Sequence, residues 1–387
     1  MKHNHRLCTR CVMDTTDPDI RFDRYGICNH CSRYDQLANE RVFIGEEGRQ
    51  RLQSILARIT SEGAKQDYHC LIGVSGGVDS TFVAYKVKEL GLRPLAVHLD
   101  NGWDSELAVS NIHKALHTLD IDLYTHVIDW EEFKDLQLAF LRASTPDSEI
   151  PTDHAIVSLM YQMADRMGVK YVITGRNVRT ETHVPAAWSR GHFDWKYIES
   201  VHKLFGQVEL RTYPHRTRQE ERRYRRTQKW IDILNYVDYR KEDAIKILEN
   251  ALGWQYYGGK HHESIYTRFF QGYILPTKFG FDKRRGHFSS LICSGEITRD
   301  RALELLQEAP YPTELQEHDL GYVTKKLGLT TEEFAAIMSL TKKTILDYPS
   351  YARDDLKAPR RFVAQVRRGA GRIARDILGR NIRRLMP

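Results

Sequence analysis

The segment that most constrains the fold is a short apolar run, residues 70–74, that passes directly into Ser75-Gly-Gly-Val-Asp-Ser80. Apolar residues then recur at helical spacing, which predicts a strand, a tight turn and a helix. Glycines let the backbone approach an anion closely, and a helix N-terminus offers free N–H donors to phosphate. We therefore predict a phosphate-binding loop made by Val74, Ser75, Gly76, Gly77, Val78, Asp79 and Ser80. Asp79 fits among phosphates only with a cation between them, so we assign it to Mg²⁺.

The residues around this loop alternate between short apolar runs and amphipathic segments. Such alternation is typical of an α/β fold with a parallel sheet and helices on both faces. We expect strands at 69–74, 94–99, 123–128 and 171–174, and helices at 80–90, 105–119 and 153–167.

The loop lacks the Gly-x4-Gly-Lys-Ser pattern of nucleotide hydrolases. It resembles the loop of the PP-loop ATP pyrophosphatases, which include asparagine synthetase, NAD synthetase, GMP synthetase and tRNA thiolases. The resemblance implies an adenine nucleotide alpha hydrolase-like fold. It also implies that ATP is the cofactor, that a substrate oxygen attacks its α-phosphate, and that pyrophosphate leaves.

Two later strand ends fit the same resemblance. In this superfamily the end of the second strand holds adenine and ribose, and a later strand end brings a glycine to the α-phosphate. The implied ATP contacts in this chain are His98, Leu99, Asp100, Asn101, Thr174 and Gly175. Arg176 and Asn177, which follow directly, are candidate substrate contacts.

Four cysteines near the start form two pairs, Cys8-x2-Cys11 and Cys28-x2-Cys31, with 16 residues between the pairs. This spacing is typical of two knuckles that close on one zinc ion. Four thiolates fill a tetrahedral shell, so the predicted Zn²⁺ is structural. An iron–sulfur cluster and redox thiols are the alternatives. Cys70 and Cys293 stand apart and are predicted to be core residues.

The distal half contains two blocks of polar and basic residues. Gly258-Gly-Lys-His-His-Glu-Ser264 offers His261, His262 and Glu263 for gripping a polar substrate, or it is a solvated loop. The second block sets Lys278, Lys283 and Arg284 among glycines and aromatic residues. Developing charge on pyrophosphate requires such cations, so we assign these three residues to catalysis. The alternative is a wet basic surface.

Taken in this order, the cysteine quartet, the loop, Thr174-Gly-Arg-Asn177 and the two distal blocks closely resemble the N-acetyl sugar amidotransferases of bacterial surface-polysaccharide pathways. The resemblance covers about residues 5–350. It implies adenylation of the acetamido oxygen of a nucleotide-activated sugar and replacement of that oxygen by ammonia, which gives an acetamidino group. A UDP-diacetamido uronic acid is the expected substrate, and nonulosonic acids remain open. The chain shows no glutaminase domain of its own, so the resemblance implies a separate glutaminase subunit.

Two other functions compete with this interpretation. A tRNA thiolase shares the loop, often has cysteine knuckles and suits a basic tail, but the remaining cysteines do not form its spaced catalytic pair. A zinc-ribbon binding protein without catalysis leaves Asp79 unexplained. We expect no nucleic acid partner.

Charge and hydropathy indicate where the protein works. The net charge is +7, and Arg360 to Arg384 alone contains nine arginines. The apolar positions between them predict a basic amphipathic helix that contacts a partner or an anionic membrane surface. The polar start and the lack of a long apolar run predict a cytoplasmic protein.

The predicted organisation has five parts. They are a four-cysteine zinc module (1–45), a helical connector (46–66), the PP-loop domain (67–310), a helical C-terminal region (311–355) and the basic tail (356–387).

Overall fold

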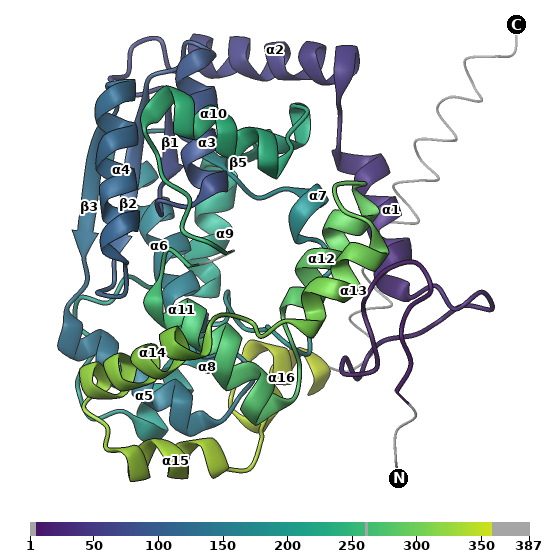
Figure 1. Ribbon diagram of the computed structural model, residues 1–387. Helices are drawn as coiled ribbons and strands as arrows, with labels where there is room; N and C mark the ends of the chain where they lie inside the picture. Colours follow the sequence, from purple (N-terminus) through teal and green to yellow (C-terminus); the bar gives the residue numbers. More distant parts are fainter. Residues whose placement is uncertain (1–4, 260–261, 358–387) are drawn as a thin grey trace, which may run out of the picture.

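The computed structural model describes residues 5–259 and 262–357. Its centre is a parallel sheet with the strand order β3-β2-β1-β4-β5 (Figure 1). The strands are β1 (Cys70–Gly73), β2 (Pro94–Asp100), β3 (Asp122–Val127), β4 (Tyr171–Thr174) and β5 (Lys229–Asp232). The strand order reverses between β1 and β4, which pair directly through Leu71 with Val172 and Ile72 with Ile173. Ligands of such sheets bind at this reversal, beyond the carboxyl ends of the strands.

Alternate residues of the strands enter two separate hydrophobic cores, one on each face of the sheet. Cys70 and Ile72 join the core under α3 (Val78–Glu89), α4 (Glu106–Leu119) and α10 (Lys241–Leu252). Leu71 faces the other way, into the core under α5 (Trp130–Ala143), α6 (Ile150–Arg166) and α8 (Trp195–Phe205). Because both faces are covered, β1 and β2 are apolar almost throughout. The predicted α/β parallel fold is confirmed.

The N-terminal segment lies beside the helices that follow the sheet. The cysteine-rich start leads into α1 (Asn29–Arg41) and then α2 (Gly45–Glu62). Figure 1 shows α1 next to α7 (Val178–Glu181) and α12 (Arg284–Cys293). The following helix, α13 (Arg299–Gln307), packs against α12. Within the described chain, the remaining elements are α9 (Arg218–Thr227), η1 (Ile233–Tyr236), α11 (Ile265–Phe269), the π-helix η2 (Phe270–Phe279), α14 (Thr313–Leu327), α15 (Thr331–Ser339), η3 (Ile345–Asp347) and α16 (Tyr351–Lys357).

The predicted strands agree with the structure to within about one residue at each end, within the usual variation of element boundaries. The missed elements include α5 and β5, whereas α14 and α15 lie in the region predicted to be helical at 311–355. The predicted tail helix and residues 358–387 as a whole lie outside the described residues. Among residues 5–259 and 262–357, no helix is both long and apolar enough to cross a bilayer.

Candidate active site and cysteine cluster

The predicted phosphate loop joins β1 to α3 at the point where the strand order reverses. Gly76 has φ +76°, and a Cβ there would lie 2.6 Å from the carbonyl oxygen of Ala108 on α4, so only glycine fits. The Ser75 N–H donates to Ser80 Oγ at 3.2 Å, which closes the turn onto the first turn of α3. The loop is thus shaped by its own sequence and by close packing against α4.

Three aromatic residues from a distant segment hold this loop in place. Trp254 Nε1–H donates to the Gly76 carbonyl oxygen at 2.9 Å, and the Val78 N–H donates to Tyr257 Oη at 3.1 Å. The Tyr239 hydroxyl donates to Asp79 Oδ1. Burial, followed by the charge of Asp79, raises the pKa of Tyr239, so the hydroxyl keeps its proton for this bond. Sequence reasoning missed these residues, and the only signal for them was the aromatic density around Tyr256.

The second predicted strand end lies against the same loop. A Cβ on Gly175, just beyond β4, would sit 3.1 Å from the Asp79 carbonyl carbon. A Cβ on Gly77 would likewise sit 3.1 Å from Glu263 Oε1. The structure therefore brings Asp79, Gly175 and Glu263 together from three separate parts of the sequence.

A cavity of about 620 Å³ opens from Asp79. Thr180 of α7 and the start of α10 form one side, and residues 268–311 form most of the rest. Its charged and imidazole lining residues are Asp79, Arg240, Lys241, Glu242, Asp243, His262, Arg268, Lys283, Arg284, His287, Glu296 and Glu308. The volume suits a small organic ligand, and the cations suit anionic groups on it.

Lys283 lies between this cavity and a buried acidic cluster. Asp147 accepts from Ser189 Oγ and lies 3.4 Å from His192 Nε2, while Glu149 accepts from Thr267 Oγ1. Burial raises the pKa of Glu149 to about 8. Burial also raises the pKa of Asp147, but His192 and the charge of Lys283 outweigh it and bring that pKa to about 2. Lys283 thus lines the cavity and also acts electrostatically on the carboxyl group behind it.

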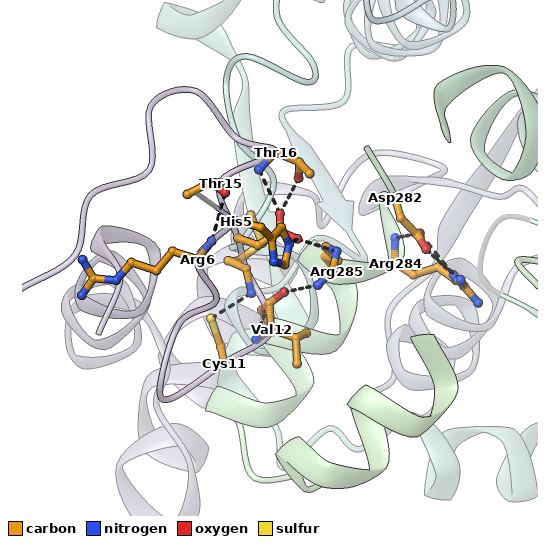
Figure 2. A network of polar contacts seen from close by, with 12 residues as sticks. His5, Arg6, Cys11, Val12, Thr15, Thr16, Asp282, Arg284 and Arg285 are labelled. Atoms are coloured by element: carbon orange, nitrogen blue, oxygen red, sulfur yellow. Dashed lines mark hydrogen bonds and ion pairs between the residues drawn. The ribbon is translucent and has the colours of Figure 1, made fainter. Parts of the chain in front are cut away.

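The other two predicted catalytic cations, Lys278 and Arg284, already bond to other groups of the chain. Lys278 is buried, does not line the cavity, and donates from Nζ to the Ile337 carbonyl oxygen at 2.6 Å. Burial, followed by the charge of Lys342, lowers the pKa of Lys278 to about 8. Arg284 lines the cavity, but its guanidinium pairs with Asp282 at 2.7 Å (Figure 2) and also donates to main-chain carbonyls around residue 308. The geometry favours Lys283 for ligand contact and a positioning role for Arg284.

Several residues predicted to contact ATP instead hydrogen-bond to other groups of the chain or are buried in its core. The two ring nitrogens of His98 lie 2.9 Å from the Val74 carbonyl oxygen and 3.2 Å from Asp104. Burial lowers the pKa of His98, but the hydrogen bond and charge of Asp104 outweigh it, and the net direction is upward. None of the four residues after Val97 lines the cavity. Leu99 is buried, while Asp100 and Asn101 accept main-chain N–H groups from Gly102 and Trp103.

Thr174, Arg176 and Asn177 also form hydrogen bonds or ion pairs with other residues of the chain. Thr174 Oγ1 donates to Asp232 Oδ1 at 2.6 Å, and the exposed Arg176 pairs with the same oxygen at 3.2 Å. Asn177 is buried and caps α7 by accepting the Thr180 N–H. From the histidine block, His262 lines the cavity, and His261 lies outside the described residues.

The four predicted zinc ligands converge at the N-terminus. All four cysteines are fully buried and unpaired by disulfides, and their sulfur atoms lie within 4.8 Å of one another. Neighbouring sulfur–sulfur distances are 3.9 Å for Cys8–Cys31, 3.6 Å for Cys11–Cys28 and 3.7 Å for Cys28–Cys31. Tetrahedral zinc with Zn–S bonds of about 2.3 Å requires sulfur separations of about 3.8 Å. Main-chain N–H groups also point at the sulfurs, for example Cys28 N to Cys8 Sγ at 3.2 Å, so the donor set fits zinc.

Polar contacts attach this cysteine module to α12 and α13. Figure 2 shows Arg285 reaching the Val12 carbonyl oxygen, a contact of 3.0 Å. Arg285 Nε also pairs with the buried Asp14 at 3.1 Å. Arg299 donates to the carbonyl oxygens of Cys8 and Cys11. The module therefore lies against the helix that also carries cavity-lining residues.

Comparison with solved structures gives low scores. NMN synthetase from Francisella tularensis matches with a TM-score of 0.28 and 16% identity, covering 57% of this chain and 96% of that one. An NH3-dependent NAD synthetase from Campylobacter jejuni, in complex with the nitrate ion, matches with a TM-score of 0.30 and 13% identity, covering 76% and 98%. These scores are too low to establish a shared fold. No curated protein matches the chain.

A family match covers the segment that builds much of the cavity. Residues 263–362 match the family described as "LPS biosynthesis protein WbpG-like, C-terminal domain". This segment begins at Glu263, beside the loop glycine Gly77, and includes Lys283. The similarity to the WbpG-like family of lipopolysaccharide biosynthesis proteins is therefore shown for this C-terminal segment.

Proposed function

We propose that the chain is an ATP-dependent amidotransferase of lipopolysaccharide O-antigen biosynthesis that converts an acetamido group of a nucleotide-activated sugar into an acetamidino group. One observation carries this proposal: Asp79 of the phosphate loop and Lys283 of the WbpG-like domain line the same cavity of about 620 Å³. The proposal rests on this shared cavity, where the predicted phosphate-binding loop lies beside the segment that matches the family model.

The chemistry explains why ATP is required. An amide carbonyl is a poor electrophile until its oxygen becomes a good leaving group, and adenylation of that oxygen achieves this. Ammonia then replaces the oxygen, and AMP and pyrophosphate are released. In this scheme the Ser75–Ser80 loop binds the phosphates, Asp79 holds Mg²⁺, and Lys283 compensates charge on pyrophosphate or on the sugar phosphate.

The cysteine quartet has a separate role in the proposal. Zinc held by Cys8, Cys11, Cys28 and Cys31 is structural, since four thiolates leave no position for a substrate. It fixes a short segment that has little apolar side chain to bury, and through that segment it supports α12.

The direct test combines ATP, Mg²⁺ and ammonium chloride with a panel of UDP-diacetamido uronic acids, nonulosonic acids and bulk tRNA. We expect equimolar AMP and pyrophosphate with one class of sugar, and the product mass should change by replacement of O with NH. Release of AMP with tRNA alone would instead support the thiolase alternative. No AMP with any member of the panel would contradict the proposal.

Lys283→Ala should lower kcat/KM for the sugar by about 10²–10³-fold, because it removes a cation facing developing negative charge. The matched control is Lys278→Met, whose ammonium bonds to the main chain away from the cavity. We expect the control to lower the melting temperature without this loss of kcat/KM. Equal kcat/KM for Lys283→Ala and the wild type would place Lys283 on a passive surface.

Nitrogen supply gives another expected outcome. Near neutral pH most free ammonia is ammonium, which has no lone pair, so turnover with ammonium chloride should rise as the pH rises. Glutamine should support efficient turnover only after addition of a glutaminase subunit, since docked delivery protects ammonia from protonation. Amidine and glutamate production can be measured side by side with and without that subunit. Efficient use of glutamine by this chain alone would reveal a catalytic site absent from the proposal.

A further inference from the structure

Cys293 packs against the hydrophobic core, as the sequence predicts, but it does not stand apart from the other cysteines, which corrects that part of the expectation. Its sulfur, at the end of α12, lies 3.8 Å from Cys31 Sγ and 3.7 Å from His183 Nε2. The ligand atoms of Cys31, His183 and Cys293 all lie within 4.8 Å of one another. Cys31 thus takes part in two clusters of metal-binding side chains.

The distances in this second cluster agree with coordination of a metal ion. Tetrahedral zinc with bonds of about 2.3 Å to sulfur and about 2.0 Å to nitrogen places two sulfurs about 3.8 Å apart, and sulfur and nitrogen about 3.5 Å apart. The observed separations are 3.8 Å and 3.7 Å. The quartet itself shows the same spacing.

The hydrogen bonds of His183 prepare its ring for metal binding. Ser290 Oγ lies 3.2 Å from the Gly286 carbonyl oxygen, which can only accept, so the single hydroxyl proton is used there. The contact of 3.2 Å between His183 Nδ1 and Ser290 Oγ is then satisfied by the tautomer in which Nδ1 carries the proton and donates it. A neutral imidazole protonated on Nδ1 presents the lone pair of Nε2 toward Cys293. Metal-binding histidines are commonly oriented in this way by a partner on their other nitrogen.

We propose that a second zinc ion binds to Cys31, His183 and Cys293, with the Cys31 thiolate bridging it to the zinc of the quartet. Four thiolates around one Zn²⁺ leave a net charge of −2. The Cys293 thiolate, 3.8 Å from Cys31 Sγ, would make the net charge of this largely buried cluster −3. A second Zn²⁺ brings the five-thiolate cluster to −1. Because Cys293 is only half-buried, the fourth position of this ion is left to water.

The second ion would join three segments that are distant in the sequence. Cys31 belongs to the N-terminal module, His183 follows α7, and Cys293 ends α12. Thr180 of α7 and His287 of α12 line the cavity. A bond network through this metal would therefore fix two cavity walls to one another and to the N-terminal module.

The first test is metal content and needs no variant. We expect two zinc ions per chain in the purified protein by inductively coupled plasma mass spectrometry. Substitution with Co²⁺ should give two tetrahedral sites with sulfur-to-cobalt charge-transfer bands. A bridging thiolate should couple the two spins magnetically. One zinc per chain, iron in place of zinc, or two uncoupled cobalt ions would overturn the proposal.

Substitution of Cys293 tests where the second ion binds. Cys293→Ala should hold one zinc and lose the magnetic coupling, while Cys70→Ala, which changes a buried cysteine in the other hydrophobic core, should keep both. Cys293 in the wild type should resist alkylation until a chelator removes the second ion. Rapid alkylation of Cys293 in zinc-replete protein would contradict the proposal and identify a free thiol beside His183.

Discussion

Asp79→Asn should lower turnover by at least about 100-fold while the protein remains folded. The carboxylate lines the cavity at the first turn of α3, where phosphate oxygens would otherwise face it without a cation. An amide keeps the size of the side chain and its hydrogen bonding to Tyr239, but it removes the negative charge that holds Mg²⁺. Initial rates of pyrophosphate release and the melting temperature, measured on the same sample, separate chemistry from folding.

The matched control is Asp120→Asn, which makes the same chemical change at an exposed position just after α4. Asp120 has φ +49°, a conformation that asparagine tolerates, so activity should be unchanged. Tyr239→Phe should lower turnover by about 10-fold, which is less than the effect of Asp79→Asn. It should also raise the Mg²⁺ concentration needed for the half-maximal rate. Near-normal turnover in a folded Asp79→Asn protein would remove Asp79 from the proposed mechanism.

Cys28→Ser should lower the melting temperature by about 10 °C or more, because loss of a thiolate weakens a metal site that contributes several kcal/mol to folding. The effect should spread beyond the N-terminus. Val12 N donates to Ser289 Oγ at 3.2 Å, and Arg299 donates to the Cys8 carbonyl oxygen at 3.0 Å, so loosening the module removes partners from α12 and α13. Hydrogen exchange should rise in residues 5–31 and 284–307.

The control for this variant is again Cys70→Ala, since Cys70 lies in β1 and in a different hydrophobic core from the quartet. Removal of the metal from the wild type by a chelator should lower the melting temperature in the same way. Turnover per folded molecule should change much less. A purified protein with no bound metal, or a Cys28→Ser variant that melts at the wild-type temperature, would contradict a structural zinc site.

The missed helix α5 shows where sequence patterns were misleading. Its buried face includes Glu132 and Asp135, which look like surface residues in the sequence. In the structure Glu132 accepts the N–H groups of Thr212 and Tyr213, and Asp135 accepts those of Gln207 and Val208. These carboxylates can be buried because N–H groups of a distant loop hydrogen-bond to them. The local sequence does not show these partners, so the two charged residues interrupt the apolar pattern that would otherwise predict a helix.

Strand β5 was missed for a different reason. It has only four residues, and its sequence carries a lysine at one end and an aspartate at the other. Its strand character comes from pairing with β4, where Tyr171 lies opposite Lys229 and Thr174 opposite Asp232. A short edge strand of this kind is specified mainly by the strand beside it.

The sequence by itself determined the local features: the strand and helix around the phosphate loop, the parallel character of the sheet, and the spacing of the cysteine quartet. These depend on residues close together in the chain, through side-chain period, glycine geometry and thiol chemistry. Only the tertiary structure decided that Tyr239 orients Asp79, that Lys283 faces the cavity while Lys278 does not, and that Cys293 joins Cys31 and His183. Those outcomes depend on contacts across as many as 262 positions, which packing fixes and sequence spacing does not encode.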